Sequence, residues 1–438
     1  MLNTIDFLPR TPKRSHLNKK GKSGFYDYYA GYSSEFVEDV LNFWNLPHAS
    51  VILDPWNGSG TTTNVAAAHG YKALGFDINP VMLIVAKSRE ISPSAASRLE
   101  FFKRLIIERY NSHRSNQFPY SDPLEGWLTL ETSTAIRNIE ALIQTIIIKH
   151  KTPFLLYHNL GELKNLSAEA SFFYVGLFRL LREISLPLRS SNPTWIKRPK
   201  LGERKISISD NSILEIFQDQ VEELIELLHQ EQNINGPRQV RLDIAMSENL
   251  PLEDKSVNAI VTSPPYCTRI DYAVLTSLEL GLLGCSQKEM KHLRQNFMGT
   301  PVISKTKPVV SQKWGQGCLK IIDAIGNHES KASQTYYLRT YLQYFDSLNH
   351  SLRELNRVLK NDGQCVLVVQ NSYYKNVYIN LAEIIKDMTE PFHWEIVQIF
   401  DYLSPQNMLQ INSKSKKYRV DGKEKEFVLF FKKEGSDD

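Results

Sequence analysis

Residues 51–70 have the sequence VILDPWNGSGTTTNVAAAHG, and this stretch decides the fold class. A short apolar run leads to Asp54, then to the turn Gly58-Ser59-Gly60, and then to an alanine-rich segment of helical composition. Glycines let a ligand approach the backbone closely, and the first turn of a helix offers free amides. The pattern therefore predicts a strand–turn–helix unit with a binding site at the turn. A tight turn without a ligand would have the same sequence, so the motif needs support from elsewhere.

Support comes from the next apolar run, ALGFDINP (73–80), which places Asp77 at a predicted strand end. A carboxylate about twenty residues after a glycine turn can accept both hydroxyls of a ribose. Further along, Asp243 follows one short apolar run, and the tetrapeptide SPPY (263–266) follows the next. The two motifs at predicted strand ends indicate a common site more strongly than either one alone.

Short apolar runs of strand character recur along the chain, with helical patterns between several of them. This alternation predicts an α/β protein with a mainly parallel sheet. A serine-capped helix is expected after Ser33 and Ser34, and the clearest helix is expected from about 335 to 360, ended by a turn at 361–363. The seven expected strands are VIL (51–53), ALGF (73–76), VRL (240–242), NAIVT (258–262), CVLVV (365–369), IVQIF (396–400) and FVLFF (427–431).

The composition excludes several classes of protein. Hydrophobic residues make up 42% and charged residues 23% of the 438 residues, which is ordinary for a chain that buries a core. No apolar stretch approaches the ~18 residues of a membrane span, and the first residues do not resemble a secretory signal. The four cysteines form no CxxC pair, so neither a disulfide framework nor a metal site is expected. These features predict a cytoplasmic, nucleoid-associated protein without a membrane partner.

The motifs DPWNGSGTT, FDINP and TSPPY, in this order, resemble those of the S-adenosylmethionine-dependent DNA amino-methyltransferases. That family methylates an exocyclic amine of cytosine or adenine. SPPY resembles the tetrapeptide of the cytosine-N4-specific members, whereas the adenine enzymes more often begin it with Asp or Asn. The resemblance implies a Rossmann-like class I methyltransferase core with a seven-stranded sheet and a large helical insertion. It also implies S-adenosylmethionine as the cofactor.

The tetrapeptide Ser263, Pro264, Pro265 and Tyr266 is the expected catalytic motif. The Ser263 hydroxyl and the Pro264 carbonyl are suitable acceptors for an amine, and consecutive prolines fix the local chain path. Tyr266 offers a face for stacking on a base that has left the duplex. The competing interpretation is a rigid turn. Cys267 is not expected to be a nucleophile, because the chain has no Pro-Cys dipeptide.

The resemblance assigns the glycine turn to the methionine part of the cofactor, Asp77 to the ribose and Asp243 to the adenine amine. Ser33 and Ser34 either face the methionine carboxylate or only cap a helix. The expected cofactor-binding residues are Tyr32, Ser33, Ser34, Asp54, Pro55, Trp56, Gly58, Ser59, Gly60, Thr61, Thr62, Asp77, Ile78, Asp243 and Ile244.

Contact with DNA is expected from basic stretches outside the core. Residues 189–205 hold six basic residues against one acid, and residues 10–22 hold six basic residues and no acid. Both runs could equally be solvated surface or contact phosphates. The candidate DNA-binding residues are Trp195, Lys197, Arg198, Lys200, Arg269 and Arg294.

The expected organisation and function follow from these motifs. We predict cytosine-N4 methylation of double-stranded DNA, with a restriction nuclease or defence system as a possible partner. The alternatives are adenine-N6 methylation, an RNA guanine amino-methyltransferase, and a non-catalytic nucleic-acid-binding subunit. The recognition sequence and the oligomeric state are left open. The predicted parts are a basic arm (1–24), a catalytic core (25–90, 241–285 and 335–433), a mostly helical insertion and candidate target-recognition domain (91–240), a second insertion or DNA-facing loop (286–334), and a disordered tail (434–438).

Overall fold

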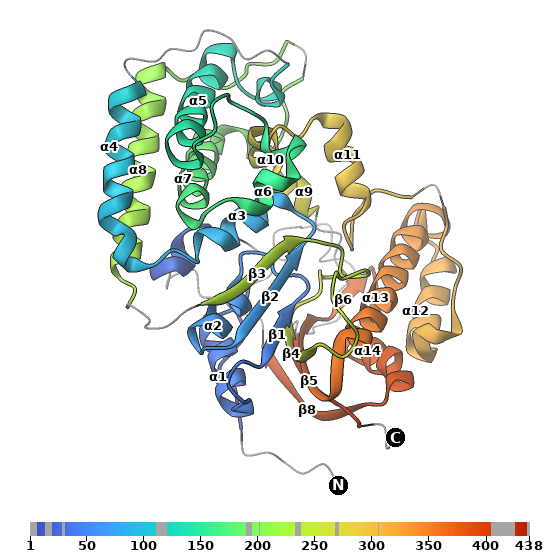
Figure 1. Cartoon of the computed structure of the whole chain (residues 1–438). Helices are drawn as coiled ribbons and strands as arrows, with labels where there is room; N and C mark the ends of the chain where they lie inside the picture. The colour runs from blue at the N-terminus through green and yellow to red at the C-terminus, as the bar shows by residue number, and fades with distance from the viewer. Residues whose placement is uncertain are drawn as a thin grey trace.

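The protein is described by a computed structural model that contains a seven-stranded sheet of order β3-β2-β1-β4-β5-β9-β8 (Figure 1). Strands β1 to β5 are parallel, and β9 is antiparallel to both β5 and β8. The structure describes residues 7–13, 20–28, 31–110, 121–189, 195–200, 202–232, 238–267, 271–304, 306–403 and 425–435. The strands are β1 (Val51–Asp54), β2 (Lys72–Asp77), β3 (Gln239–Ile244), β4 (Val257–Thr262), β5 (Leu359–Gln370), β8 (Trp394–Leu403) and β9 (Lys425–Lys433).

All seven expected strands are therefore confirmed, and so is the Rossmann-like, mainly parallel sheet. Successive residues of a strand point to opposite faces, and both faces here are apolar. Ile52 packs into one buried cluster and its neighbour Leu53 into another. A sheet covered on both faces explains why its strands have nearly continuous apolar sequences.

Helices cover the two faces of the sheet. On one face lie α1 (Ser34–Trp44) and α2 (Thr61–Ala68), and on the other lie α12 (Gly315–Gly326), α13 (Leu338–Val358) and α14 (Leu381–Thr389). The predicted serine cap is present, because the Ser33 hydroxyl accepts a hydrogen bond of 3.2 Å from the Phe36 amide. Among the described residues, no helix is long and apolar enough to cross a bilayer.

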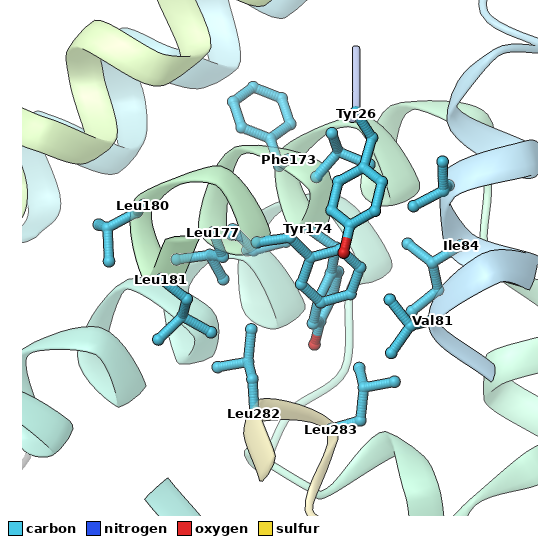
Figure 2. Close-up of a cluster of buried hydrophobic side chains, with 14 of the residues drawn as sticks. Tyr26, Val81, Ile84, Phe173, Tyr174, Leu177, Leu180, Leu181, Leu282 and Leu283 are labelled. Carbon is cyan, nitrogen blue, oxygen red and sulfur yellow. The ribbon is translucent and has the colours of Figure 1, made fainter. Parts of the chain in front are cut away.

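A large helical insertion follows the first strands, as expected. It is drawn above the sheet in Figure 1. Its apolar side chains share one buried cluster with α3 (Pro80–Ser88) and α10 (Ser277–Leu283), and Figure 2 shows Ile84 and Leu282 on opposite sides of Tyr174. The insertion is thus packed against the core. Its longer helices are α4 (Ala96–Tyr110), α5 (Leu130–Ile143), α7 (Ala168–Ile184) and α8 (Asp210–His229), and α6 (Leu160–Asn165) is short.

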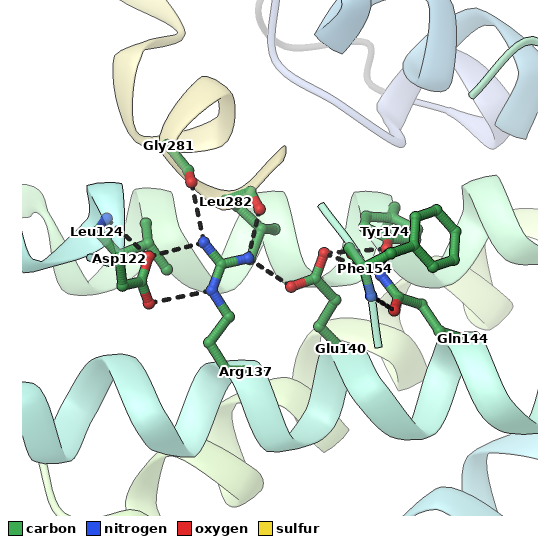
Figure 3. Close-up of polar contacts among 9 residues, drawn as sticks. All are labelled: Asp122, Leu124, Arg137, Glu140, Gln144, Phe154, Tyr174, Gly281 and Leu282. Carbon is green, nitrogen blue, oxygen red and sulfur yellow. Dashed lines mark hydrogen bonds and ion pairs between the residues drawn. The ribbon is translucent and has the colours of Figure 1, made fainter. Parts of the chain in front are cut away.

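A buried ionic network also joins the insertion to the core (Figure 3). The Arg137 side chain on α5 is 1% exposed and donates to both oxygens of Asp122 at 2.7 and 3.0 Å. It also contacts Glu140 and the backbone carbonyls of Gly281 and Leu282 on α10. Both carboxylates are nearly inaccessible, so the guanidinium is surrounded by acceptors.

The segment predicted as a second insertion or DNA-facing loop (286–334) contains two α-helices among its described residues. Residues 287–295 form α11 (Gln287–Gln295), and α12 packs against α13 and α14 as part of the layer that covers the sheet. Two side chains at the start of α12 are buried, with Trp314 1% exposed and Cys318 0%. The sequence GQGC at its start has low helix propensity, which hid the helix.

Two further differences concern the end of the chain. The predicted turn at 361–363 lies within the bounds of β5, where Asp362 has a φ of +59° and the pairing register with β4 shifts. A short hairpin of β6 (Ser372–Tyr374) and β7 (Val377–Ile379) was not expected. Because its strands have only three residues each, they leave no clear pattern in the sequence.

Candidate cofactor and substrate site

The carboxyl ends of β1, β2 and β4 meet at one edge of the sheet and open into a recess. Its empty volume is about 880 Å³, including the part open to solvent. The recess is lined by Gly58 and Asp77 from the first two strand–helix units, and by all four residues of the SPPY tetrapeptide. The two motifs that are about 200 residues apart therefore share one cavity.

The turn after β1 requires glycine at two positions. Gly58 has a φ of +47°, and a Cβ atom there would lie 2.7 Å from the Tyr28 ring. Gly60 has a φ of +81°, and its Cβ atom would lie 2.9 Å from the Ala86 Cβ. Residues with side chains disfavour this backbone conformation, and both contacts are shorter than packing allows. The turn is therefore built so that its backbone faces the recess.

Asp77 lies at the end of β2 and faces the recess. Its carboxylate accepts hydrogen bonds of 2.8 Å from the amides of Gly58 and Asn79. Burial raises the pKa of Asp77 to about 6, and these two hydrogen bonds act in the opposite direction. Because each carboxylate oxygen has two lone pairs, Asp77 can still accept hydroxyls from a ligand.

Asp54 lies behind the glycine turn and does not line the recess. It is 1% exposed and accepts hydrogen bonds from Thr262 at 2.6 Å and from the Tyr32 hydroxyl at 2.8 Å. Burial raises its pKa to about 6. Asp54 thus ties β1 to the end of β4, directly before the tetrapeptide.

The tetrapeptide is held at both ends by side-chain hydrogen bonds. The Ser263 hydroxyl donates to the Val368 carbonyl on β5 at 2.8 Å. The Tyr266 hydroxyl donates to the Glu426 carboxylate on β9 at 2.8 Å. Since the only hydrogen of the Ser263 hydroxyl is used in this bond, its lone pairs are oriented to accept.

Eight of the expected cofactor-binding residues line the recess, and seven do not. Those that line it are Tyr32, Pro55, Trp56, Gly58, Ser59, Thr61, Asp77 and Ile78. Ser33 and Ser34 line a neighbouring recess together with Arg10 and Lys13. Asp54, Gly60, Thr62, Asp243 and Ile244 line neither recess.

The clearest difference between the expected and the observed site is the position of Asp243. Its carboxylate forms an ion pair of 2.8 Å with Lys164 on α6. The residues that face the recess after β3 are instead 245–248. The residues after β3 that line the recess therefore lie two to five positions beyond Asp243 in the sequence.

Several lining residues were missed. Tyr272 and Phe297 stack with ring centroids 6.3 Å apart at an angle of 24°. Phe297 belongs to the second insertion, and nothing in its local sequence indicates that it reaches the recess. The missed residues are Tyr28, Gly31, Asn57, Ala245, Met246, Ser247, Glu248, Tyr272, Asn296, Phe297 and Met298.

The candidate DNA-binding residues differ in their exposure and in the contacts that they already make within the protein. Trp195 is 44% exposed, and the Lys200 side chain is also exposed. Lys197 pairs with Glu203 at 3.0 Å, and the Arg198 guanidinium lies 4.9 Å from the centre of the Trp127 ring.

Arg294 donates two hydrogen bonds to the Asp271 carboxylate, so its charge is already paired. Arg269 lies outside the described residues.

The described parts of the basic arm pack against the fold. Arg10 forms ion pairs with Asp39 and Glu38 on α1. Lys22 is 3% exposed, and burial lowers its pKa to about 8. Of the two alternatives left open for this run, a solvated surface does not describe Arg10 and Lys22.

The four cysteines are buried, and Cys267 does not line the recess. Within the described ranges, no three His, Cys, Asp or Glu side chains are grouped as metal ligands would be. The local chemistry is thus that of carboxylates, hydroxyls, aromatic rings and backbone groups.

The strand order, the glycine turn and the tetrapeptide together define a Rossmann-like methyltransferase. Residues 257–437 match the DNA methylase family of N6/N4 methyltransferases. This match agrees with the family that the sequence motifs resemble.

The chain is similar over most of its length to several type II methyltransferases. It is 24% identical to M.AvaI of Nostoc sp. over 402 residues, covering 86% of this chain and 79% of the relative. It is 22% identical to M.BsoBI of Geobacillus stearothermophilus over 375 residues, covering 82% and 70%. It is 24% identical to M.MvaI of Kocuria varians over 385 residues, covering 82% and 78%.

Similarity to solved structures is weaker. An rRNA methyltransferase, aviRa from Streptomyces viridochromogenes, aligns with a TM-score of 0.28 and 9% identity, covering 92% of this chain and 87% of that one. The YcgJ protein from Bacillus subtilis aligns with a TM-score of 0.32 and 8% identity, covering 91% and 98%. The fold assignment rests on the strand order described above.

Proposed function

We propose that the protein transfers a methyl group from S-adenosylmethionine to the N4 amine of a cytosine that has been flipped out of duplex DNA. The observation that carries this proposal is the single recess shared by the glycine turn, Asp77 and the SPPY tetrapeptide. A cofactor held by the glycine turn and Asp77 would lie beside a base held by the tetrapeptide. The match of residues 257–437 to a DNA methylase family favours DNA over RNA as the substrate.

The residues at the glycine turn fit the cofactor. The absent side chain at Gly58 leaves the backbone open to the recess, and Asp77 supplies a buried acceptor for ribose hydroxyls. The start of α2, next to Thr61, offers helix amides to a carboxylate. When bound, S-adenosylmethionine supplies an electrophilic methyl group on a positively charged sulfur.

Ser263 and Pro264 supply the chemistry at the amine. An aromatic amine is a poor nucleophile because its lone pair is delocalised into the ring. Acceptors for its N–H groups localise that lone pair and stabilise the positive charge that develops during transfer. The Ser263 oxygen is suited to this role, since its hydrogen is donated to Val368. Alignment of amine and methyl group would supply most of the remaining acceleration.

Tyr266 would stack on the extruded base. A base must leave the duplex before its amine can reach a cofactor in a recess of this kind. The ring of Tyr266 lines the recess, and its hydroxyl is fixed by Glu426. This bond limits rotation of the ring and holds its face ready.

The choice of cytosine rests on the serine at the first position of the tetrapeptide, as in the cytosine-N4 members of the family. Adenine N6 is the alternative, with the same acceptors and the same transfer. The curated relatives are named type II methyltransferases. We therefore place the protein in a restriction–modification context, where a nuclease would share its recognition sequence.

The decisive experiment is to express the protein in a host that lacks DNA methylation and to analyse the DNA by nucleoside mass spectrometry. We expect 4-methylcytosine. Cys267→Ser should yield the same product, because direct transfer needs no thiolate and Cys267 is 3% exposed, outside the recess. Detection of 6-methyladenine alone would replace the base with the alternative. Detection of 5-methylcytosine would contradict the mechanism.

We further propose that the helical insertion, with Lys200 at its surface, contacts the DNA backbone. Neutralising one phosphate contact should reduce the dependence of log K on log salt concentration by about one unit. We expect this for Lys200→Gln in filter-binding titrations. The matched control is Lys72→Gln, an exposed lysine at the amino end of β2, away from the recess. Equal salt slopes for both variants would assign Lys200 to solvated surface.

A further inference from the structure

Tyr344 on α13 is bonded to the backbone of the SPPY tetrapeptide. Its hydroxyl donates a hydrogen bond of 2.9 Å to the carbonyl oxygen of Pro265. The side chain is 2% exposed, and burial raises the pKa of Tyr344 well above its ordinary value. The phenol therefore keeps its proton and remains a donor at any physiological pH.

Both residues next to Pro264 are anchored by a hydrogen bond. The Ser263 hydroxyl is anchored to β5 through Val368, and the Pro265 carbonyl is anchored to α13 through Tyr344. A residue before proline is restricted to extended conformations, and Pro264 itself has a fixed φ. The Pro264 carbonyl therefore has little freedom to turn while both anchors hold.

Gly299 of the second insertion lies close to both Tyr344 and the tetrapeptide. Gly299 has a φ of +76°, and a Cβ atom there would lie 3.2 Å from the Tyr266 carbonyl oxygen and 3.8 Å from the Tyr344 ring. The second insertion thus packs over the tyrosine and the tetrapeptide together.

We infer that Tyr344 is a positioning residue for methyl transfer: by holding the Pro265 carbonyl, it aims the preceding Pro264 carbonyl at the target amine. Tyr344 does not line the recess and touches neither cofactor nor base by this assignment. Its effect is exerted through the backbone of the tetrapeptide. The inference rests on the proposed function, because it needs an amine in front of Pro264.

The test compares Tyr344→Phe with a matched substitution, Tyr336→Phe. The Tyr336 hydroxyl also donates to a prolyl carbonyl, that of Pro301, and also at 2.9 Å, but away from the tetrapeptide. Each variant loses one hydroxyl and keeps its ring. Initial rates of methyl transfer are measured with DNA from the methylation-free host over ranges of cofactor and DNA concentration.

We expect Tyr344→Phe to lower kcat about three- to tenfold, as the loss of one hydrogen bond allows. The KM values for cofactor and DNA and the melting temperature should remain close to those of the wild type. Tyr336→Phe should change kcat less than twofold. This split between kcat and KM is the mark of positioning, because a loosened fold would shift all of these quantities together.

Equal kcat values for the two variants would overturn the inference. A Tyr344→Phe variant in which kcat, both KM values and the melting temperature shift together would also overturn it, in favour of a purely structural role. A wild-type protein that transfers no methyl group to DNA would contradict the proposed function and this inference together. An active wild type with an equally active Tyr344→Phe variant would contradict this inference alone.

Discussion

The Asp77 carboxylate accepts a hydrogen bond of 2.8 Å from the backbone amide of Gly58. The acid at the end of β2 thereby holds the turn that follows β1. One side chain joins the two elements that the cofactor would bridge. Loss of Asp77 should therefore affect both the shape of the turn and the number of acceptors in the recess.

The first prediction is that Asp77→Ala weakens S-adenosylmethionine binding by ~1–3 kcal/mol, the usual cost of losing a hydrogen bond to a charged acceptor. Isothermal titration calorimetry measures it. Asp243→Ala is the comparison, because Asp243 also follows a strand of the sheet but is paired with Lys164 outside the recess. We expect a much smaller loss for Asp243→Ala. A larger loss there would restore the role that the sequence suggested for Asp243.

The second prediction concerns pH. Burial raises the pKa of Asp77 to about 6, so this carboxyl takes up a proton at a higher pH than an ordinary aspartate. Because the ionised form is the acceptor for ribose hydroxyls, cofactor affinity should be constant above pH ~7 and fall as the pH drops through ~6. Calorimetry between pH 5 and 8 measures this.

Asp77→Asn is the control for the pH dependence. It should lower the affinity and flatten most of the pH dependence, leaving only the contribution of Asp54, whose pKa is also about 6. An affinity of the wild type that is unchanged down to pH 5 would show that Asp77 does not bind as a carboxylate.

The sequence predicted the seven strands because both faces of the sheet are covered and each strand is a short apolar run. It predicted Asp77 and the tetrapeptide because their positions at strand ends are local features. It did not predict α12, whose glycine-rich start hides a helix that is stabilised by packing on α13 and α14.

The remaining differences from the sequence-based expectations come from contacts between distant parts of the chain. Asp243 is drawn away by Lys164, about 80 residues earlier, and Arg198 packs on Trp127. Phe297 enters the recess from a segment with no recognisable pattern. A charge pattern identifies basic residues but not their partners, so the availability of such side chains has to be read from the structure.

The third prediction concerns the buried network around Arg137. Removing a partner from a buried ion pair leaves uncompensated charge and costs ~3–5 kcal/mol. We expect Arg137→Met to lower the stability by this amount, since Asp122 and Glu140 would remain buried. The comparison is Arg98→Met, which removes an ion pair to Glu169 from a side chain that is 56% exposed and should cost ~0–1 kcal/mol. Urea unfolding followed by circular dichroism measures both. Similar midpoints for the two variants would contradict the role of the network.

The last prediction concerns the tyrosine that would stack on the base. Stacking on an aromatic side chain is worth ~1–3 kcal/mol per base, so Tyr266→Ala should lower methyl transfer roughly tenfold to a hundredfold. Cofactor affinity should change little, because Gly58 follows β1 and Asp77 ends β2, whereas Tyr266 follows β4. Tyr266→Phe keeps the ring and loses only the hydrogen bond to Glu426, so its activity should lie between those of the wild type and the alanine variant.

Glu426→Gln further separates the stacking of the Tyr266 ring from the hydrogen bond made by its hydroxyl. Its amide oxygen can still accept from the Tyr266 hydroxyl, so this variant should be more active than Tyr266→Phe. Burial raises the pKa of Glu426, and the hydrogen bond from Tyr266 acts in the opposite direction. Rates of 4-methylcytosine formation by mass spectrometry, together with cofactor binding by calorimetry, measure all three variants. If Tyr266→Ala and Tyr266→Phe lose the same activity, the ring face is not used for stacking, and the base must be held by another side chain of the recess.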